Sequence, residues 1–493
     1  MKGYFRVKKK LTILYCTPEV TPFSKTGGLG DVAGSLPKAL AAAGCDVRVI
    51  TPKYAGINES SYKLKKIIDN MPLRIGNRKE AGSLYEGKLP GSKVPAYFVS
   101  CSKYFERKEL YQENGKDYVD NLERFSFFSM MTLHSVEKLG WQPDIVHCND
   151  WQTALIPVYL KNVMKTRNIS SLFTIHNIGY QGLFKREQLP ITGLDWELFN
   201  IKGLEYFGKI NLLKGGIIFS DIVTTVSPSY SREIQTKEYG YGLEGVLKER
   251  GKDLYGIING VDYDEWDPLQ DSHISVNYSI KSIGRKKECK KELQKNCGLP
   301  VTDKPLIGMV SRLDDHKGYD ILAEIMSELM HLDIQMVMLG TGKAKYQDLF
   351  KKFKEQYPDK LSLNLFFENT LAHKIEAGSD IFLIPSKYEP CGLSQLYSFK
   401  YGAVPVAHKT GGLADTITDF IPSTIADKKA TGFLFSHYSP DALLKAVMLS
   451  LYVYEDKVTW KKLVTAGMKS DFSWKQPAKE YVKLYNKILV SPL

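Results

Sequence analysis

The sequence predicts an α/β protein whose strands form parallel sheets. Short apolar runs rich in β-branched residues recur along the chain, and each is followed by a stretch with helical character. Most of these runs are continuously apolar rather than alternating, which is typical of strands that helices bury on both faces. The repeated order of strand and helix is that of α/β folds. A length of 493 residues is enough for two large domains of this kind.

The expected strands fall into two groups, one on each side of residue 260. Those of the first group are Leu11–Cys16, Asp46–Thr51, Pro95–Ser100, Asp144–Cys148, Ser171–His176 and Asp221–Ser227. Those of the second group are Pro305–Ser311, Ile334–Leu339, Asp380–Pro385 and Val404–Ala407. Because a parallel sheet needs several strands, each group is expected to form a sheet of its own.

A boundary is predicted near residue 260, where Asn-Gly gives a turn signal. The segment Asp264–Lys281 that follows is rich in Asp, Ser, Pro and Tyr and has no clear period. At the end of the chain, Ser473–Leu493 is expected to be a helix with one apolar face. We therefore predict two α/β domains, residues 1–260 and 261–472, and a final helix, residues 473–493.

Composition and charge exclude several classes of protein. The 67 Lys and Arg residues exceed the 55 Asp and Glu residues by 12, a surplus that suits an anionic ligand such as a phosphate ester. No dense basic run with interleaved aromatic residues appears, so no nucleic-acid partner is expected. No apolar run approaches the roughly 18–20 residues that cross a bilayer, and the apolar stretch near the start is too short for a secretion signal. We therefore expect no membrane partner.

The pattern of cysteines and histidines argues against disulfides and metals. The seven cysteines are scattered, and no two have the C-x-x-C spacing. A disulfide framework or a thiolate zinc site is therefore not expected, and the cytoplasm is the simplest compartment. No two histidines have the H-x-x-x-H or H-E-x-x-H spacing, so no catalytic metal is expected.

The first candidate site is the glycine-rich segment Lys25–Gly34, which follows the first expected strand. Free N–H groups at a helix start, together with the Lys25 amine, favour an anion such as phosphate. The alternative is that the glycines only permit close packing of helix and strand. A nicotinamide or flavin site is disfavoured, because Thr17–Ser24 separates the strand from the loop and no acid ends the second strand.

The same pattern returns in the second half of the chain. Lys25–Asp31 and Lys409–Asp415 agree at six of seven positions. Each segment follows an expected strand and precedes a helical stretch, so each half is expected to present a similar glycine-rich turn. The alternative is a chance match between common loop residues.

Polar residues also follow two other strands of the first half. His147, Asn149 and Asp150 come at the end of one strand, and His176 and its Asn neighbour come at the end of another. In open α/β sheets, ligands bind beyond the carboxyl ends of the strands. His147 lies inside the apolar run and is expected to be a core residue, whereas His176 comes just past its run and is expected to be functional.

Two segments of the second half could bind a phosphorylated sugar. Arg312 and Lys317 follow a strand and could clamp a diphosphate, or they could be surface charges paired with the neighbouring aspartates. Glu389 comes in a turn after another strand and could accept hydrogen bonds from sugar hydroxyls, or it could cap a helix. The Gly392 and Leu393 amides would meet phosphate. A nucleophilic role for the adjacent Cys391 is disfavoured, since no His–Asn relay is visible.

These motifs together resemble the bacterial glycogen synthase and plant starch synthase family of retaining glucosyltransferases. The resemblance covers nearly the whole chain. It is carried by Lys25–Asp31, Asp117–Phe125, Asn149–Leu160, Phe173–Gly182, Tyr239–Asp262, Ser311–Gly318, Pro385–Tyr397, Lys400–Thr416 and Asp471–Trp474. It implies the GT-B fold, in which two Rossmann-like domains with parallel sheets face each other across an interdomain cleft. It also implies that the final helix crosses back to the first domain.

The resemblance implies transfer of glucose from ADP-glucose to the non-reducing end of an α-1,4-glucan or malto-oligosaccharide, with retention and without a cofactor. His176, Arg312, Lys317 and Glu389 would be the catalytic residues. The residues expected to bind substrate are Lys25, Gly28, Asp31, Asp150, Asn259, Phe367, Cys391, Gly392 and Leu393. Asp150 would lie on the acceptor side or support the sugar, and Asn259 would lie near the hinge and the donor. Phe367 would stack on the base, although ordinary core packing is the alternative.

The sequence departs from the family's pattern at two positions. Gln152 stands where members often carry a histidine, so a role for that histidine in acceptor contact is in doubt. Phe367 replaces a tyrosine of some members. No pair of carboxylates marks a double displacement, and the resemblance therefore implies a front-face route in which the departing phosphate helps to deprotonate the acceptor. A pyridoxal-phosphate phosphorylase and a glucan-binding scaffold are the rival interpretations.

Overall fold

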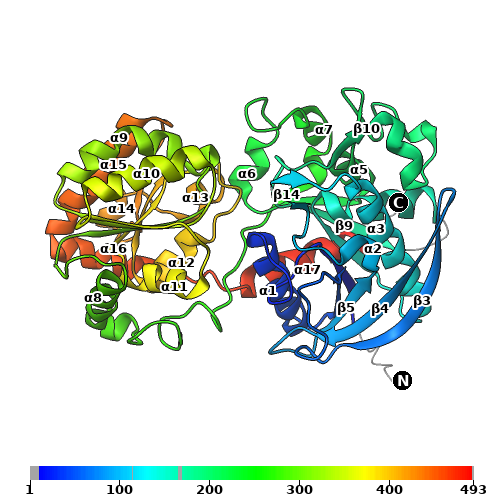
Figure 1. Ribbon diagram of the computed structural model, residues 1–493, viewed down its shortest axis with the longest axis horizontal. Helices are drawn as coiled ribbons and strands as arrows, with labels where there is room; N and C mark the ends of the chain where they lie inside the picture. The colour runs from blue at the N-terminus through cyan, green and yellow to red at the C-terminus, as the bar shows by residue number, and fades with distance from the viewer. Residues whose placement is uncertain (1–9, 114, 165–168, 491–493) are drawn as a thin grey trace, which may run out of the picture. The chain divides into compact units, whose positions relative to one another are not determined.

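The computed structural model describes residues 10–113, 115–164 and 169–490. The chain divides into two compact units (Figure 1). Unit 1 is Met1–Val226, Ser231–Gly260 and Trp474–Leu493, and unit 2 is Ser227–Tyr230 and Val261–Ser473. Within the described residues, every helix is too short or too polar to span a membrane.

Unit 1 is built on a nine-stranded sheet with the order β14-β13-β9-β8-β1-β2-β5-β4-β3. All six strands predicted for the first half are confirmed in it. Its parallel members are β1 (Thr12–Cys16), β2 (Asp46–Pro52), β5 (Pro95–Ser100), β8 (Ile145–Asn149), β9 (Ser170–Ile175), β13 (Ile222–Thr225) and β14 (Leu254–Gly256). Their continuous burial accounts for the apolar runs, since helices cover both faces of this part of the sheet.

One edge of the unit 1 sheet contains two antiparallel strands that the sequence did not predict. Strands β3 (Lys65–Ile75) and β4 (Arg78–Lys88) form an antiparallel hairpin, and β4 pairs antiparallel with β5. The hairpin turns at Gly76, whose φ of 57° suits glycine. One face of β3 is exposed, so its sequence alternates and carries charged residues, which hid it from a search for continuous apolar runs.

The remaining elements of unit 1 connect and cover this sheet. The main helices are α1 (Gly28–Ala42), α3 (Asn121–Lys138), α4 (Leu155–Asn162), α5 (Leu212–Phe219), α7 (Glu244–Glu249) and α17 (Lys475–Val490). A small antiparallel sheet contains β10 (Leu183–Lys185), β11 (Glu205–Tyr206) and β12 (Lys209–Asn211). Asn211 ends β12 and caps α5, because its side chain accepts a hydrogen bond from the backbone N–H of Lys214.

The C-terminal helix α17 is anchored in the core of unit 1 through tyrosines. Tyr481, Tyr485 and Ile488 on its apolar face are buried. The Tyr485 hydroxyl lies 2.7 Å from Nδ1 of His147, whose Nε2 lies 2.7 Å from Thr174 Oγ1. His147 is therefore a satisfied core histidine, as predicted.

Removing the Tyr485 hydroxyl is expected to destabilise unit 1. Tyr485→Phe would leave a buried ring nitrogen of His147 without its partner, and we expect the free energy of unfolding to fall by about 1–3 kcal/mol. Tyr452→Phe is the matched control, because Tyr452 is 79% exposed and should change stability little. Equal stability of the two variants in chemical denaturation would contradict the anchoring role.

Unit 2 is built on a six-stranded parallel sheet with the order β17-β16-β15-β18-β19-β20. The four strands predicted for the second half are confirmed in it. The strands are β15 (Leu306–Val310), β16 (Gln335–Leu339), β17 (Leu361–Asn364), β18 (Ile381–Ile384), β19 (Val404–His408) and β20 (Phe433–Phe435). Strand β20 is too short, and β17 too polar, to stand out as an apolar run.

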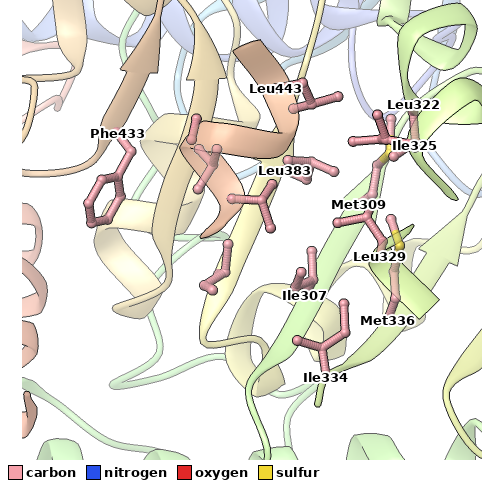
Figure 2. Packing of buried hydrophobic residues seen from close by; sticks show 14 of the residues in the cluster. Ile307, Met309, Leu322, Ile325, Leu329, Ile334, Met336, Leu383, Phe433 and Leu443 are labelled. Carbon is pink, nitrogen blue, oxygen red and sulfur yellow. The ribbon is translucent and has the colours of Figure 1, made fainter. Parts of the chain in front are cut away.

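Helices cover both faces of the unit 2 sheet (Figure 1). They are α8 (Lys286–Asn296), α9 (Tyr319–His331), α10 (Ala344–Gln356), α11 (Asn369–Gly378), α12 (Ser394–Tyr401), α13 (Gly411–Thr416), α14 (Pro422–Ala426), α15 (Pro440–Glu455) and α16 (Lys457–Lys469). Successive side chains of each strand point to opposite faces. Ile307 and Met309 therefore enter the core that contains α9 and α15, shown in Figure 2, whereas Leu306 enters the core that contains α8 and α11.

In both units, an aspartate just before one strand accepts a hydrogen bond from the neighbouring strand. Asp144, just before β8, accepts a hydrogen bond from the backbone N–H of Thr12 on β1 at 2.9 Å. Asp380, just before β18, accepts one from Leu306 on β15 at 2.9 Å and pairs with Lys290 at 2.7 Å. These carboxylates satisfy backbone N–H groups at the amino ends of the strands.

Candidate active site

In both units, the order of strands reverses beside the loops that the sequence singled out. In unit 2, β16 and β17 lie on one side of β15, and β18 and β19 lie on the other. In unit 1, β2 and β5 lie on one side of β1, and β8 and β9 lie on the other. Ligands of open α/β sheets bind at the carboxyl ends of the strands flanking such a switch point. The relevant loops are therefore those after β15 and β18, and those after β1 and β8.

The Lys25 loop connects β1 to α1, which begins at Gly28. Lys25 Nζ lies 2.7 Å from Asp31 Oδ1, so the cation is held over the first turn of the helix by a carboxylate. Thr21 Oγ1 lies 3.3 Å from the same oxygen. The structure thus brings Lys25, Gly28 and Asp31 together at the carboxyl end of β1.

Glu19 shapes this loop, and the sequence analysis did not identify it. Its buried carboxylate accepts hydrogen bonds from Thr26 N at 2.6 Å and Gly27 N at 3.3 Å, and also from Thr26 Oγ1 and from the Tyr111 hydroxyl at 2.8 Å. Two of the backbone N–H groups expected to meet a phosphate are therefore occupied by a carboxylate. A carboxylate three residues past a strand end was the signal available in the sequence.

Asp150 follows β8 in an unusual backbone conformation, with φ of 57°. Strain of this kind is found at functional sites more often than elsewhere. Its carboxylate accepts a hydrogen bond from the backbone N–H of His176 at 2.7 Å, which joins the loops after β8 and β9. Burial raises the pKa of Asp150 to about 7, and the backbone donors of His176 and Asn177 oppose this rise.

His176 comes directly after β9 and faces Asn149, the last residue of β8. His176 Nε2 lies 2.9 Å from Asn149 Oδ1. Burial lowers the pKa of His176 to about 3, so the ring is neutral near pH 7. The ring can therefore donate and accept hydrogen bonds, but it cannot serve as a cation there.

Lys317 and Glu389 meet at the switch point of unit 2. Lys317 Nζ lies 2.6 Å from Glu389 Oε2, and Ser386 Oγ donates to the same oxygen at 2.9 Å. The partner of the Lys317 amine is thus neither of the neighbouring aspartates. Glu389 does not cap α12 either, because the residue before that helix is Leu393.

Two lysines that follow β16 pair with an aspartate of this loop. Asp315 accepts hydrogen bonds from Lys343, Lys345 and the Tyr346 hydroxyl. Arg312 comes two residues after β15 and is exposed. Asp315, between Arg312 and Lys317, therefore faces the residues that follow β16.

Glycines allow the loops after β15, β18 and β19 to approach closely. A Cβ on Gly318 would lie 2.1 Å from the Pro385 carbonyl oxygen, and one on Gly412 would lie 2.0 Å from the Cys391 carbonyl oxygen. Gly412 N also donates to the Glu389 carbonyl at 3.0 Å. Cys391 is buried and Gly392 has φ of 72°, so the chain turns there just before α12 begins.

The repeated glycine pattern occupies equivalent places in the two units. Lys25–Asp31 leads into α1 and Lys409–Asp415 leads into α13, each beyond the carboxyl end of a strand. The acids differ in their partners, since Asp31 pairs with Lys25, whereas Asp415 accepts from Ser229 N and Ser229 Oγ at 2.7 Å. The structural interpretation of the match is confirmed.

Two further predicted residues have contrasting surroundings. Phe367 is 72% exposed in the loop after β17, so the alternative of ordinary core packing is wrong. Asn259 is buried, and its Oδ1 accepts no hydrogen bond from the described residues. Across residues 10–113, 115–164 and 169–490, no group of three or more His, Cys, Asp or Glu side chains is placed to hold a metal ion.

The two α/β units agree with the comparisons below, which show that the chain is a glycosyltransferase of the GT-B class. Residues 12–249 match the family model described as the starch synthase catalytic domain, and residues 290–462 match that of glycosyl transferases group 1. Sucrose-phosphate synthase from Thermosynechococcus elongatus, at 17% identity and a TM-score of 0.59 over 98% of this chain and 100% of that one, shares the fold alone.

Relatives that match over nearly the whole chain identify the family within the class of glycosyltransferases. The glycogen synthase of Fervidobacterium nodosum is 48% identical over 95% of this chain and 97% of its own, and that of Thermosipho africanus is 46% identical over 96% and 98%. The catalytic domain of starch synthase IV from Arabidopsis thaliana, solved with ADP and acarbose, has a TM-score of 0.91 at 33% identity, covering 98% of this chain and 100% of that one. The chain belongs to the glycogen synthase and starch synthase family.

Proposed function

We propose that this enzyme transfers glucose from ADP-glucose to the non-reducing end of an α-1,4-glucan, with retention of anomeric configuration. The observation that carries the proposal is the Lys317–Glu389 pair at 2.6 Å, which combines a phosphate-binding cation with a sugar-binding carboxylate at the switch point of unit 2. The family to which the chain belongs supports the glucan product. The ADP in the related starch synthase IV structure supports an adenine nucleotide.

Unit 2 binds the donor in this proposal. Arg312 and Lys317 neutralise the diphosphate, and the Gly392 and Leu393 amides before α12 contact it. Glu389 accepts hydrogen bonds from glucose hydroxyls, because its Oε1 is not committed to the hydrogen bonds that Lys317 and Ser386 make to Oε2. The backbone of Cys391 shapes the loop, and Phe367, an exposed ring in the loop after β17, stacks on the base.

Unit 1 carries the residues assigned to the acceptor side in this proposal, together with the Lys25 loop. Asp150 and His176 contact sugar hydroxyls at the ends of β8 and β9. Lys25, with Gly28 and Asp31, meets the donor phosphates or the glucose. Asn259 serves the donor from the end of unit 1, and its buried Oδ1, which accepts no hydrogen bond from the described residues, suits a hydroxyl donor.

The proposed transfer depends on stabilising the negative charge that develops on the leaving group. The bond between glucose C1 and the β-phosphate oxygen breaks, and negative charge grows on that oxygen. Fixed cations stabilise this charge more in the transition state than in the ground state, which is what lowers the barrier. The acceptor 4-hydroxyl forms the new bond to C1 on the same face, and its proton passes to the departing phosphate. Glucose trapped covalently on Glu389 or Asp150 would contradict this front-face route.

The rate of transfer is expected to depend on the ionisation of Asp150. The ionised carboxylate accepts hydrogen bonds from sugar hydroxyls, and its pKa is raised to about 7 by burial. Activity should therefore rise with pH and differ about tenfold between pH 6 and pH 8. His176 should not contribute, because its pKa lies near 3. Asp150→Asn should be slower and lack this inflection, and an unchanged inflection in that variant would contradict the assignment.

The proposed function is tested by nucleotide release. The enzyme is incubated with ADP-glucose or UDP-glucose, with and without malto-oligosaccharide. We expect release that depends on the acceptor and is faster with ADP-glucose. Release from neither donor would refute the function, and faster release from UDP-glucose would refute the donor assignment. A cytoplasmic location is also proposed, in keeping with the seven free thiols, all of which lie within the described residues.

A further inference from the structure

The side-chain amide of Asn149 has only one orientation that satisfies its surroundings. Its Nδ2 lies 2.9 Å from the Cys16 carbonyl oxygen and 3.4 Å from the His147 carbonyl oxygen. Both of these oxygens can only accept hydrogen bonds, so the amide nitrogen must face them. The amide oxygen therefore faces the opposite direction, toward Tyr15 and His176.

This orientation decides where the His176 ring carries its proton. Asn149 Oδ1 accepts a hydrogen bond from the Tyr15 hydroxyl at 3.1 Å and lies 2.9 Å from His176 Nε2. An amide oxygen cannot donate, so the short contact is a hydrogen bond only if Nε2 carries the hydrogen. In the neutral ring, Nδ1 then carries a lone pair and can accept a hydrogen bond.

The surroundings make this arrangement rigid. Asn149 and Tyr15 are fully buried on the adjacent strands β8 and β1. The Tyr15 ring packs edge-on against His147, with centroids 4.7 Å apart, and His147 is itself held by Thr174 and Tyr485. The backbone of His176 is fixed separately by its hydrogen bond to Asp150. Hydrogen bonds therefore hold both the ring and the backbone of His176 before substrate binds.

We propose that Asn149 is a positioning residue that holds His176 as the Nε2–H tautomer, so that Nδ1 accepts a hydrogen bond from a hydroxyl of the bound sugar. The inference rests on the proposed function for its ligand, and it assigns His176 the role of an acceptor. His176 does not deliver a proton to the leaving group in this scheme. The low pKa of His176 agrees with this role, because an acceptor must stay unprotonated.

Several ionisable groups surround His176 and bear on its protonation. Asp150 lies on the loop after β8 and interacts electrostatically with Glu19, His147 on β8 interacts electrostatically with His176, and Tyr15 on β1 shares the Asn149 acceptor with His176. The carboxylates would favour a protonated His176 and the burial opposes it. The position of the proton must therefore be measured on the ring itself and not inferred from a rate profile.

The direct test is the ¹⁵N spectrum of the histidine ring nitrogens in the labelled full-length enzyme without substrate. The His176 signals are assigned by their loss in His176→Gln. We expect the shifts of an Nε2–H ring that remain constant between pH 6 and pH 8. A proton on Nδ1, or a doubly protonated ring in this range, would overturn the proposal.

Two variants connect the tautomer to activity. Asn149→Leu removes the acceptor, and we expect mixed tautomers and a loss of about tenfold in kcat. Asn149→Asp keeps an acceptor but adds a charge that raises the pKa of His176, so its ring should be doubly protonated at a pH where the native ring is neutral. Asn162→Leu is the control, because Asn162 ends α4, where its amide donates to the Val158 carbonyl at 2.9 Å, and the variant should keep the native tautomer and rate.

The outcomes separate this inference from the proposed function. The tautomer is observed without turnover, so an enzyme that transfers no glucose would refute the function and leave the ring measurement valid. A native tautomer in Asn149→Leu, or native activity despite mixed tautomers, would overturn the positioning role of Asn149 while leaving glucose transfer intact. If Asn149→Leu does not fold, the native spectrum and the Asn149→Asp variant still test whether Asn149 holds the His176 tautomer.

Discussion

Replacing Lys317 by Ala is expected to lower kcat/KM by about a hundred- to a thousandfold, with most of the loss in kcat. The Lys317 amine is placed beyond β15 and is held by Glu389 at 2.6 Å. A fixed cation there stabilises the charge that develops on the departing diphosphate, and its loss corresponds to roughly 2.7–4 kcal/mol of transition-state stabilisation. Arg312→Ala is expected to show a loss of the same kind. Steady-state kinetics with ADP-glucose and malto-oligosaccharide measures both.

The matched control is Lys345→Ala. Lys345 is also a lysine of unit 2, but it is exposed and pairs with Asp315 on the side toward β16. Its removal should change kcat/KM by less than about twofold, as expected for an exposed ion pair. Near-native kcat/KM in both Lys317→Ala and Arg312→Ala would reject their assigned roles. A thermal melt of each variant shows whether the fold is retained.

Replacing Asp380 by Ala is expected to lower the free energy of unfolding of unit 2 by about 3–5 kcal/mol. Asp380 Oδ2 pairs with Lys290 at 2.7 Å and accepts the Leu306 backbone N–H at 2.9 Å, which joins α8, β15 and β18. The variant would leave the Lys290 ammonium buried without its carboxylate. Chemical denaturation followed by tryptophan fluorescence, with Trp266 and Trp460 in unit 2, measures the loss.

Asp427→Ala serves as the control for Asp380→Ala. Asp427 pairs with Lys429 at 3.1 Å, but both side chains are largely exposed. Exposed ion pairs of this kind contribute about 0–1 kcal/mol, so this variant should unfold close to the native enzyme. If the two aspartate variants unfold alike, the buried pair does not stabilise unit 2 as described.

The parallel strands could be predicted because burial on both faces leaves a direct trace in the sequence. Strands such as β8 and β15 are continuously apolar, and their ends agree with the predicted runs within about two residues. The β3–β4 hairpin left no such trace, since one face of it is exposed. Its charged and alternating sequence resembles a loop or a polar helix when only apolar runs are sought.

The residues of the candidate site could be proposed from the sequence, but the contacts between them could not. Lys317 and Glu389 are 72 positions apart, and they meet because β15 and β18 pair in the sheet although other strands lie between them in the sequence. For the same reason Glu19 was missed, and Asn149 was noted at the end of its strand but was given no role. Their importance comes from the Lys25 loop and from His176, and neither partner can be assigned from sequence spacing alone.

The central claim is that this chain lengthens an α-1,4-glucan with glucose from a nucleotide donor. The most direct measurement is an analysis of the products formed from ADP-glucose and a malto-oligosaccharide of defined length, by NMR of the new linkage and by assay of released ADP. We expect chains extended by α-1,4-linked glucose, with one ADP released for each glucose added. Free glucose as the main product, a β-linked product, or unchanged acceptor would contradict it.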